Sequence, residues 1–251
     1  MDILPLDTLL ILTAVAAVAG MIDAIAGGGG LLALPALLWA GLPPVQALAT
    51  NKLQGTFGTA TASYRFIRGG EIDWRRLKVP ILMTFIGAVS GTLAVQRLGS
   101  ALLEDMVPVL LIAFALYFLL SPRIGDQDAQ HRISHNLFGL LIGFGVGFYD
   151  GFFGPGTGTL FAVGHMLLLG QNMVNATINT KLLNFTSNVV ALVFFLSGGH
   201  VLWVAGLVMA LGQMLGAYVG SNMVIDKGTR LIRPLLIIMS LVISIKLLLF
   251  P

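Results

Sequence analysis

Two lysines and two aspartates stand inside apolar stretches of the sequence, where an ionised side chain is costly. Lys52 and Lys181 are 129 positions apart and each is flanked by Asn or Thr, while Asp23 and Asp150 each precede a glycine-rich segment by four residues. An ionisable group at membrane depth faces a polar cavity or pairs with another group. We expect the lysines to bind an anion. The alternatives are that each lysine reaches the nearer membrane surface or pairs with an aspartate.

The two aspartates, Asp23 and Asp150, could serve in three ways that the sequence leaves open. Each could be the counter-ion of a buried lysine. Each could carry a proton, because a desolvated carboxyl group keeps its proton more readily than one in water. Each could cap backbone amides that an interrupted helix leaves free. We therefore predict that both are proton-coupling or counter-ion residues.

The glycine-rich segments, residues 27–30 and 154–158, should interrupt helices and leave backbone N–H groups free at the start of the next half-helix. That end carries positive partial charge and binds anions. Paired interrupted helices in two halves of a membrane protein point to a transporter's binding site. With the lysines, they predict a site for a small oxyanion. The predicted substrate-binding residues are Lys52, Lys181, Asn51, Gln54, Gly28, Gly29, Gly30, Gly156, Thr157, Gly158, Asn184 and Asn188.

The composition places these residues in a bilayer. The chain has 251 residues, of which 57% are hydrophobic and 10% charged, and several apolar runs reach the roughly 20 residues that cross a hydrocarbon core. We expect an integral membrane protein without a separate soluble domain. The absence of cysteine excludes disulfides and thiolate metal sites, and we expect no metal or other cofactor. The net charge of +3 comes from loops, so we expect no nucleic-acid partner.

An internal repeat organises the chain. Residues 52–120 align without a gap to residues 181–249, with 17 identical positions that include the two lysines. The basic residues fall in different loops of the two copies: residues 65–78 carry five Lys or Arg in the first copy, whereas the second copy has its cluster at residues 227–233. Since Lys and Arg mark cytoplasmic loops, equivalent loops lie on opposite faces. This is the pattern of an inverted-topology repeat.

The predicted fold is an all-α polytopic membrane protein with two inverted-topology repeats, residues 1–120 and 136–251, joined by a cytoplasmic linker at residues 121–135. Each repeat should contain a broken helical hairpin plus three transmembrane helices. The hairpins should cover residues 6–40 and 136–170, in pieces of about 12 to 17 residues that turn within the protein. Both termini should then be periplasmic.

Small residues recur every four positions at residues 87–91 and 212–220. This spacing gives a flat strip on one helix face, against which a neighbouring backbone can pack closely. We expect these two helices to be central in the bundle. The strips predict packing and name no ligand.

Several of these motifs resemble those of a known family. Residues 23–30 (DAIAGGGG), Pro35 and residues 49–54 (ATNKLQ), with weaker second copies at residues 150–158 (DGFFGPGTG) and 179–181 (NTK), are similar to the sulfite exporter TauE/SafE family of bacterial inner-membrane proteins. The resemblance covers essentially the whole chain. It implies export of sulfite or an organosulfonate. In the second copy Pro155 and Thr157 replace Gly28 and Gly30, so we expect unequal half-sites.

The predicted function is a secondary transporter that exports a small sulfur-containing anion across the bacterial inner membrane by alternating access. The expected partners are this anion and the lipid bilayer, with a homodimer as a possibility. One alternative is a passive small-anion channel. A more remote one is an intramembrane aspartyl protease that uses Asp23 and Asp150, although the lysines would then have no task. A purely structural membrane protein would carry its buried lysines at a cost without a function.

Overall fold

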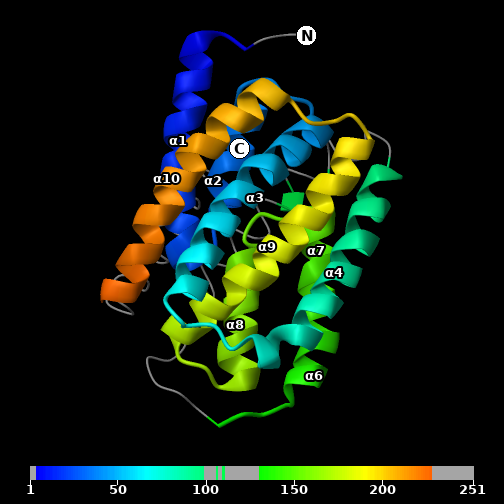
Figure 1. The fold of residues 1–251 in the computed structure, drawn as a ribbon. Coiled ribbons are helices and arrows are strands. Elements are labelled where there is room, and N and C mark those ends of the chain that lie inside the picture. Colours follow the sequence, from blue (N-terminus) through cyan, green and yellow to red (C-terminus); the bar gives the residue numbers. More distant parts are fainter. Residues whose placement is uncertain (1–3, 99–105, 107–108, 111–129, 228–251) are drawn as a thin grey trace.

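The computed structural model describes residues 4–98, 106, 109–110 and 130–227, and the regular elements in these ranges are helices (Figure 1). The first half contributes four of them and the second half the others. Their bounds are α1 Leu6–Ala26, α2 Gly30–Trp39, α3 Pro44–Arg68, α4 Trp74–Gln96, α6 His135–Phe138, the short π-helix η1 Gly139–Gly143, α7 Phe144–Phe152, α8 Thr157–Leu169, α9 Met173–Ser197 and α10 Trp203–Lys227.

Four helices of the described ranges, α1, α4, α9 and α10, are long and apolar enough to cross a membrane. Helix α3 has 25 residues but is less apolar, because it carries the polar residues around Lys52. Helices α2 and α8 have 10 and 13 residues, which is about 15 to 20 Å at 1.5 Å per residue. They are too short for a hydrocarbon core of roughly 30 Å and are half-helices.

Both predicted helix breaks are confirmed. Helix α1 ends at Ala26 and α2 starts at Gly30, while α7 ends at Phe152 and α8 starts at Thr157. The residues between them are largely buried, so both hairpins turn inside the protein, as expected. The predicted piece length of about 12 to 17 residues is wrong for the first hairpin, because α1 is a continuous helix of 21 residues. Only its returning arm, α2, is short.

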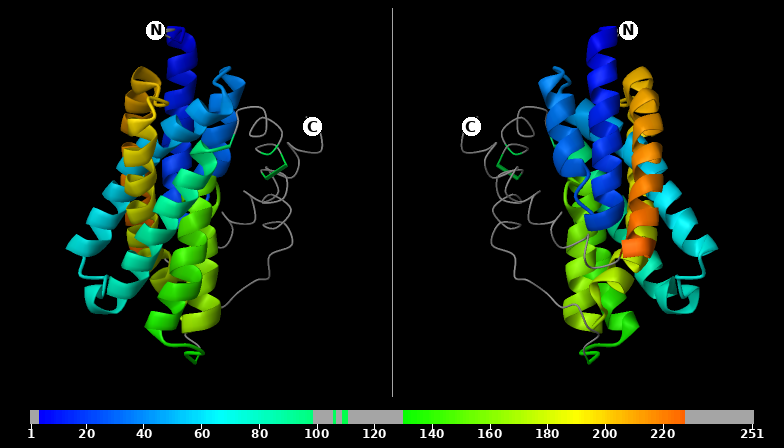
Figure 2. Two further views of the ribbon diagram at one scale, coloured as in Figure 1. Left: turned by 90° about the vertical axis from the view of Figure 1, so that its right-hand side faces the viewer. Right: turned by 90° about the vertical axis from the view of Figure 1, so that its left-hand side faces the viewer.

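The long helices α3 and α9 lie in the middle of the bundle, with α1 and α10 on one side and α4 and α7 on the other (Figure 1). Figure 2 shows α1 and α10 side by side along their length. Helices 129 positions apart run in opposite directions in Figure 1: α3 against α9, and α4 against α10. Helices α3 and α4 meet at the end of the molecule where α6 and α9 begin.

The strips of small residues pack as predicted. Gly216 of α10 lies against the backbone of Ala17 in α1, and Gly91 of α4 lies against the backbone of Phe148 in α7, so closely that an added Cβ atom would collide with a carbonyl oxygen. The expected central position of these two helices is wrong. The opposite face of α10 carries exposed side chains such as Leu215, 69% exposed. The centre of the bundle belongs to α3, α9 and the breaks.

Several sequence predictions fall outside the described residues. These are the third transmembrane helix of each repeat, most of the linker at residues 121–135, the basic residues after Lys227, and the C-terminus. The end of the linker is described: the amides of Arg132 and Ile133 bond to the carbonyl of Leu168. This places the linker's end beside the C-terminal end of α8.

Candidate anion site between the helix breaks

The two helix breaks touch each other. Gly27, at the end of α1, has a φ of 82°, which favours glycine, and it lies against Gly158 of α8. A Cβ atom on Gly158 would be 2.5 Å from the Cα of Gly27, so this approach needs glycine. Beside it, the hydroxyl of Thr159 donates a hydrogen bond of 2.7 Å to the carbonyl of Ala26. The irregular backbone of both halves therefore meets at one point.

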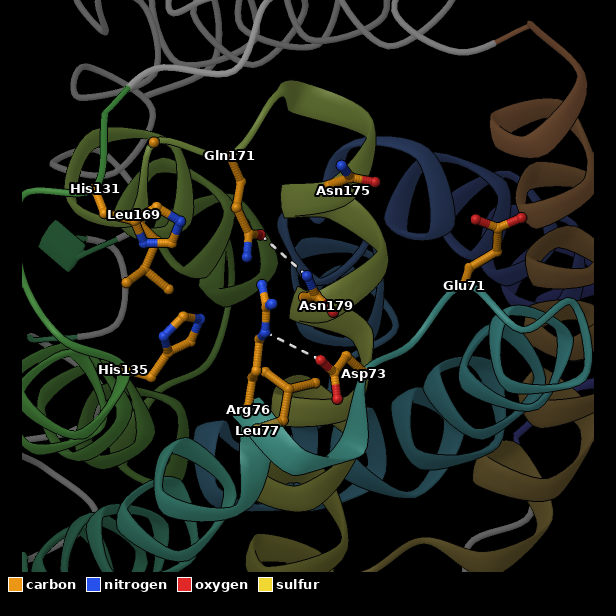
Figure 3. A pocket seen from close by; sticks show the side chains of 11 residues that line it. Glu71, Asp73, Arg76, Leu77, His131, His135, Leu169, Gln171, Asn175 and Asn179 are labelled. Atoms are coloured by element: carbon orange, nitrogen blue, oxygen red, sulfur yellow. Dashed lines mark hydrogen bonds and ion pairs between the residues drawn. The ribbon is translucent and has the colours of Figure 1, made fainter.

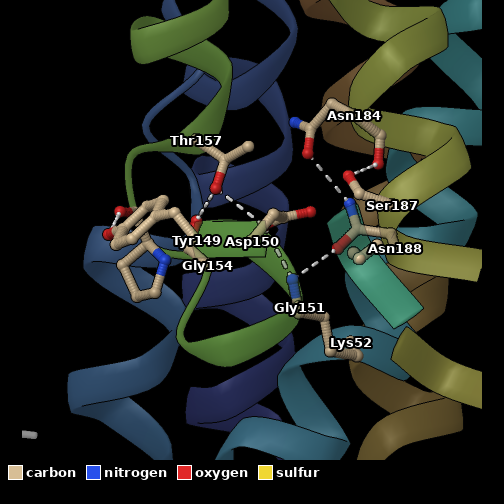
Figure 4. Close-up of polar contacts among 12 residues, drawn as sticks. Lys52, Tyr149, Asp150, Gly151, Gly154, Thr157, Asn184, Ser187 and Asn188 are labelled. Atoms are coloured by element: carbon tan, nitrogen blue, oxygen red, sulfur yellow. Dashed lines mark hydrogen bonds and ion pairs between the residues drawn. The ribbon is translucent and has the colours of Figure 1, made fainter. Parts of the chain in front are cut away.

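Lys52 of α3 reaches from the first half to the second break (Figure 4). Its Nζ donates to Asp150 Oδ1 at 2.7 Å and to Asn188 Oδ1 at 3.2 Å. The same Asp150 oxygen accepts a hydrogen bond of 2.7 Å from the hydroxyl of Thr157. Lys52 and Asp150 are each only 1% exposed, so the ion pair is held in a water-poor environment.

Lys181 of α9 makes the matching pair in the other direction, but with a different geometry. Its Nζ donates to the backbone carbonyl of Asp23 and lies 3.3 Å from Asp23 Oδ2. The other oxygen, Asp23 Oδ1, accepts from the amide of Gly29 at 3.3 Å. Asp23 is thus the counter-ion of Lys181 and also the acceptor of a backbone amide in the break, whereas Asp150 is the counter-ion of Lys52. Each ion pair joins one half of the chain to the other.

A small cavity of about 30 Å³ lies between the breaks and the central helices α3 and α9. A water molecule needs about 10 to 15 Å³ of such volume, so this cavity has room for about one or two water molecules. The cavity is lined by Asp23, Gly27, Gly30, Asn51, Lys52, Gln54, Gly55, Thr59, Asp150, Gly154, Gly156, Thr157, Gly158, Asn184, Asn188 and Gln213.

Most of the predicted site residues lie together around this cavity, and three do not. Gly28, Gly29 and Lys181 are not among the lining residues. Gly29 is packed against α1, where its amide is bound by Asp23. Lys181 is fully buried at the C-terminal end of α1. The predicted residues that do line the cavity are Lys52, Asn51, Gln54, Gly30, Gly156, Thr157, Gly158, Asn184, Asn188, Asp23 and Asp150.

The break amides contribute less than the sequence predicts. The amide of Thr157 bonds to the carbonyl of Gly154, and that of Thr159 to the carbonyl of Gly156. Local turns therefore use part of the donor set that was expected to face the anion. The side chains of α3 and α9 provide most of the polar lining instead.

Five lining residues were not predicted. Thr59 could have been found, because it stands 129 positions before Asn188 in the repeat. Gln213 is a polar residue within an apolar span, which is a signal of the same kind as the lysines. Gly27, Gly55 and Gly154 line the cavity with backbone, and no side-chain chemistry could have marked them.

A second, larger polar pocket of about 440 Å³ opens at the end of the molecule where α4, α6 and α9 begin (Figure 3). Arg76 projects into it and pairs with Asp73 at 3.0 Å. On another wall the rings of His131 and His135 lie 5.5 Å apart. Burial lowers the pKa of His135, and His131 and Arg76 lower it further, with Asp73 opposing them. His135 is therefore mostly uncharged at neutral pH.

Comparisons with known proteins identify a family and several relatives of this chain. Residues 12–247 match the family described as sulfite exporter TauE/SafE. A "Probable membrane transporter protein" of Haemophilus influenzae is 46% identical over 241 residues, covering 96% of this chain and 94% of its own. "Probable membrane transporter protein YfcA" of Escherichia coli K12 is 49% identical over 234 residues, covering 93% and 87%. "Probable membrane transporter protein YunE" of Bacillus subtilis is 22% identical, covering 84% and 86%.

No solved structure matches the chain significantly. The family match covers both helix breaks, both ion pairs and all of the described helices except the start of α1. Its relatives are named probable membrane transporter proteins, and four of the described helices are long and apolar enough to cross a membrane. The chain is a membrane transporter of the TauE/SafE sulfite exporter family.

Proposed function

We propose that the protein is a secondary transporter that exports a small sulfur-containing anion, sulfite or an organosulfonate, across the bacterial inner membrane. The observation that carries this proposal is Lys52, whose ammonium group lies in the cavity where the two helix breaks meet. Neutral polar side chains of α3, α8 and α9 surround it and can donate to oxyanion oxygens. The family's description as a sulfite exporter supports the substrate class.

The size of the cavity supports a carrier. At about 30 Å³, the site has room for about one or two water molecules, which is fewer atoms than an oxyanion of four heavy atoms brings. Substrate must then enter through movement of the surrounding helices. An open channel would need a continuous water-filled path, and the breaks and both ion pairs lie across the middle of the bundle. Alternating access of the site to the two faces fits this arrangement.

The two ion pairs weigh against the protease alternative. An aspartyl protease needs two carboxyl groups that share a proton. Here Asp150 is paired with Lys52 and Asp23 with Lys181. Each carboxylate is neutralised by an ammonium group from the opposite half and not by sharing a proton with the other aspartate.

The alternation is proposed to use two inverted-topology repeats. Helices α3 and α9 share the same bounds after a shift of 129 residues and run in opposite directions (Figure 1). Arg65, Arg68, Arg75, Arg76 and Lys78 lie at the end where α4 begins. By the positive-inside tendency, this end and the pocket in Figure 3 would face the cytoplasm, where the pocket could receive the anion. The N-terminus, at the opposite end, would be periplasmic.

Cysteine mapping tests this orientation directly, because the chain has no cysteine of its own. Single cysteines at Arg75 and at Gly199 should be labelled by a membrane-impermeant maleimide from opposite faces. In intact cells with a permeable outer membrane, Gly199→Cys should react and Arg75→Cys should react only after the inner membrane is opened. Labelling of both from the same face would exclude the proposed topology.

Flux measurements test the function itself. Purified protein in vesicles of phosphatidylethanolamine and phosphatidylglycerol should take up radiolabelled sulfite, methanesulfonate or sulfoacetate with saturation. Unlabelled anion on the far side should accelerate entry, because a carrier returns faster when it is loaded. A current that rises linearly with voltage and does not saturate would identify a channel instead. Failure to move any of the three anions would reject the proposed substrate class.

A further inference from the structure

Asp150 has one carboxylate oxygen engaged and one open. Its Oδ1 accepts hydrogen bonds from both Lys52 and Thr157, each at 2.7 Å. Its Oδ2 is buried and has no hydrogen-bond partner among the described residues. A buried carboxylate oxygen without a donor is unfavourable while the group is ionised. This oxygen belongs to a residue that lines the cavity, and a proton added to it would remove the unfavourable charge.

Two other lining residues present oxygens of the same kind. Gln54 donates its amide to Asn51 Oδ1 at 2.8 Å, and this leaves its own Oε1 buried without a partner in the described part of the chain. Gln213 Oε1, from α10, is in the same condition. All three residues are at least 97% buried. The cavity therefore offers acceptors that need a hydrogen-bond donor, in addition to the ammonium group of Lys52.

The equivalent aspartate of the first half has no such open position. Asp23 Oδ1 is occupied by the amide of Gly29, and Oδ2 by Lys181. The two ion pairs, although related by the repeat, are thus different in kind. The pair of Lys181 and Asp23 is closed, and the pair of Lys52 and Asp150 is open to the cavity.

Charge balance gives the open pair a function. The site holds two ammonium groups and two carboxylates, which sum to zero. An anion that binds the ammonium group of Lys52 adds a buried negative charge that neither ammonium group is left to neutralise, which is strongly unfavourable. Protonation of Asp150 removes that charge. The anion then takes the place of the carboxylate as the counter-ion of Lys52.

We propose that Asp150 accepts one proton for each anion that binds at Lys52, so that the anion and the proton cross the membrane together. This inference rests on the proposed transport function and names its coupling ion. With one proton per anion, the net direction follows the anion and proton gradients together, so export requires a cytoplasmic anion concentration that outweighs the inward proton gradient. The proton comes from water on the open side of the site and adds to Asp150 Oδ2. Lys52 keeps its own proton throughout. On the other side the anion leaves, the proton returns to water, and Asp150 pairs with Lys52 again.

The positions at which a coupling metal cation would bind are already occupied by lysine. Unwound carbonyls and carboxylates at helix breaks are typical ligands of Na⁺ in carriers. Here Lys181 donates a hydrogen bond to the carbonyl of Asp23 near the end of α1, and Lys52 donates one to the carboxylate of Asp150. A proton adds to the open oxygen without requiring further ligands. It is therefore the cation that this site can accept.

The surroundings contain few other groups that could titrate in its place. Asp150 faces Lys52 from α3, Thr157 from α8, and its neighbour Tyr149 on α7, whose hydroxyl donates to the carbonyl of Pro155. Asp23, from α1, lines the same cavity but is held by Lys181 of α9. Helix α4, packed along α7, brings the uncharged Thr92, and α10 brings Gln213. Asp150 is thus the group expected to respond to pH.

The first arm of the test uses the unaltered protein in vesicles. Methanesulfonate is a permanent monoanion, so any proton that moves with it is moved by the protein. Its entry should acidify the lumen, reported by a trapped pH dye, by one proton per anion, and clamping the membrane voltage should not change the rate. An acidic exterior should drive accumulation of about tenfold per unit of pH difference. Sulfite and sulfoacetate should also bring in one proton each by way of Asp150.

The second arm uses Asp150→Asn, with Asp226→Asn, an exposed aspartate of α10, as the matched control. Asparagine resembles the protonated carboxyl group, so this variant should exchange labelled for unlabelled anion but should lose accumulation driven by the pH gradient. Asp226→Asn should accumulate as the unaltered protein does. Anion flux without lumenal acidification, or full accumulation by Asp150→Asn, would overturn the coupling alone. Absence of flux for every anion would overturn the transport function as well.

Discussion

Lys52→Met should reduce anion transport more than any other single substitution at the site. The variant keeps the length and apolar body of the side chain but removes the ammonium group that the anion needs as its counter-ion. Losing one partner of a buried charge pair costs about 2 to 5 kcal/mol, which corresponds to an affinity at least about 30-fold weaker. Uptake of labelled sulfite or methanesulfonate into vesicles, measured over a range of anion concentrations, checks this.

The protein itself should remain folded in the Lys52 variant. Asp150, left without its counter-ion, can accept a proton on Oδ2, which has no hydrogen-bond partner among the described residues. Lys78→Met, at an exposed position of α4, is the matched control and should transport like the unaltered protein. Wild-type affinity in Lys52→Met would remove this lysine from the mechanism.

Lys181→Met should have its main effect on stability. Lys181 is fully buried, lies away from the cavity, and holds both the backbone carbonyl and a carboxylate oxygen of Asp23. Breaking a buried ion pair by removing one partner costs about 3 to 5 kcal/mol. The melting temperature of the detergent-purified protein should fall by an amount on the order of 10 °C.

A double variant separates the lost ion pair from lost packing. Lys181→Met with Asp23→Asn removes both charges, so the melting temperature should recover by several degrees relative to Lys181→Met alone. Lys78→Met again serves as control and should melt like the unaltered protein. If Lys181→Met melts normally but no longer binds the anion, then Lys181 is a ligand and the distinction between the closed and open pairs is wrong.

The sequence predicts well which residues the fold brings together, because breaks and buried charges leave clear patterns. The glycine segments fix the ends of α1 and α7, and the Lys52 and Lys181 motifs lie at equivalent points of α3 and α9. The fold class follows from composition. The predicted inversion of the two halves rests on the basic loops, and the opposite directions of α3 and α9 support it.

The different roles of the two lysines could not be predicted, because they depend on distances. Both lysines stand at the same position of the repeat, and the replacement of Gly30 by Thr157 predicts only that the half-sites are unequal. In the structure the hydroxyl of Thr157 donates a hydrogen bond to Asp150 Oδ1, the same oxygen that Lys52 binds. Gly30 has no side chain to do the same, and the amide of Gly29 binds Asp23 instead. The Thr157 hydroxyl and Lys52 thus share Oδ1, and Oδ2 of Asp150 has no partner among the described residues.

The number of backbone amides left free at the breaks could also not be predicted from the sequence. Helix-dipole arguments treat the first amides of α2 and α8 as available to a ligand. Tight turns in the structure use those of Thr157 and Thr159, and Asp23 uses that of Gly29. Similarly, spacing shows that α10 packs closely through small residues, but it does not tell whether the opposite face meets protein or lipid.

The two ion pairs between the halves of the chain have a consequence for its synthesis and membrane insertion. Lys52 is 98 residues from its partner Asp150, and Asp23 is 158 residues from Lys181. At a synthesis rate of about 5 to 20 residues per second, Lys52 and Asp23 are each made roughly 5 to 30 s before their partners in the second half. During that interval the insertion machinery must keep the side chains of Asp23 and Lys52 out of contact with lipid. Maturation of the first half is complete only when α9 has arrived.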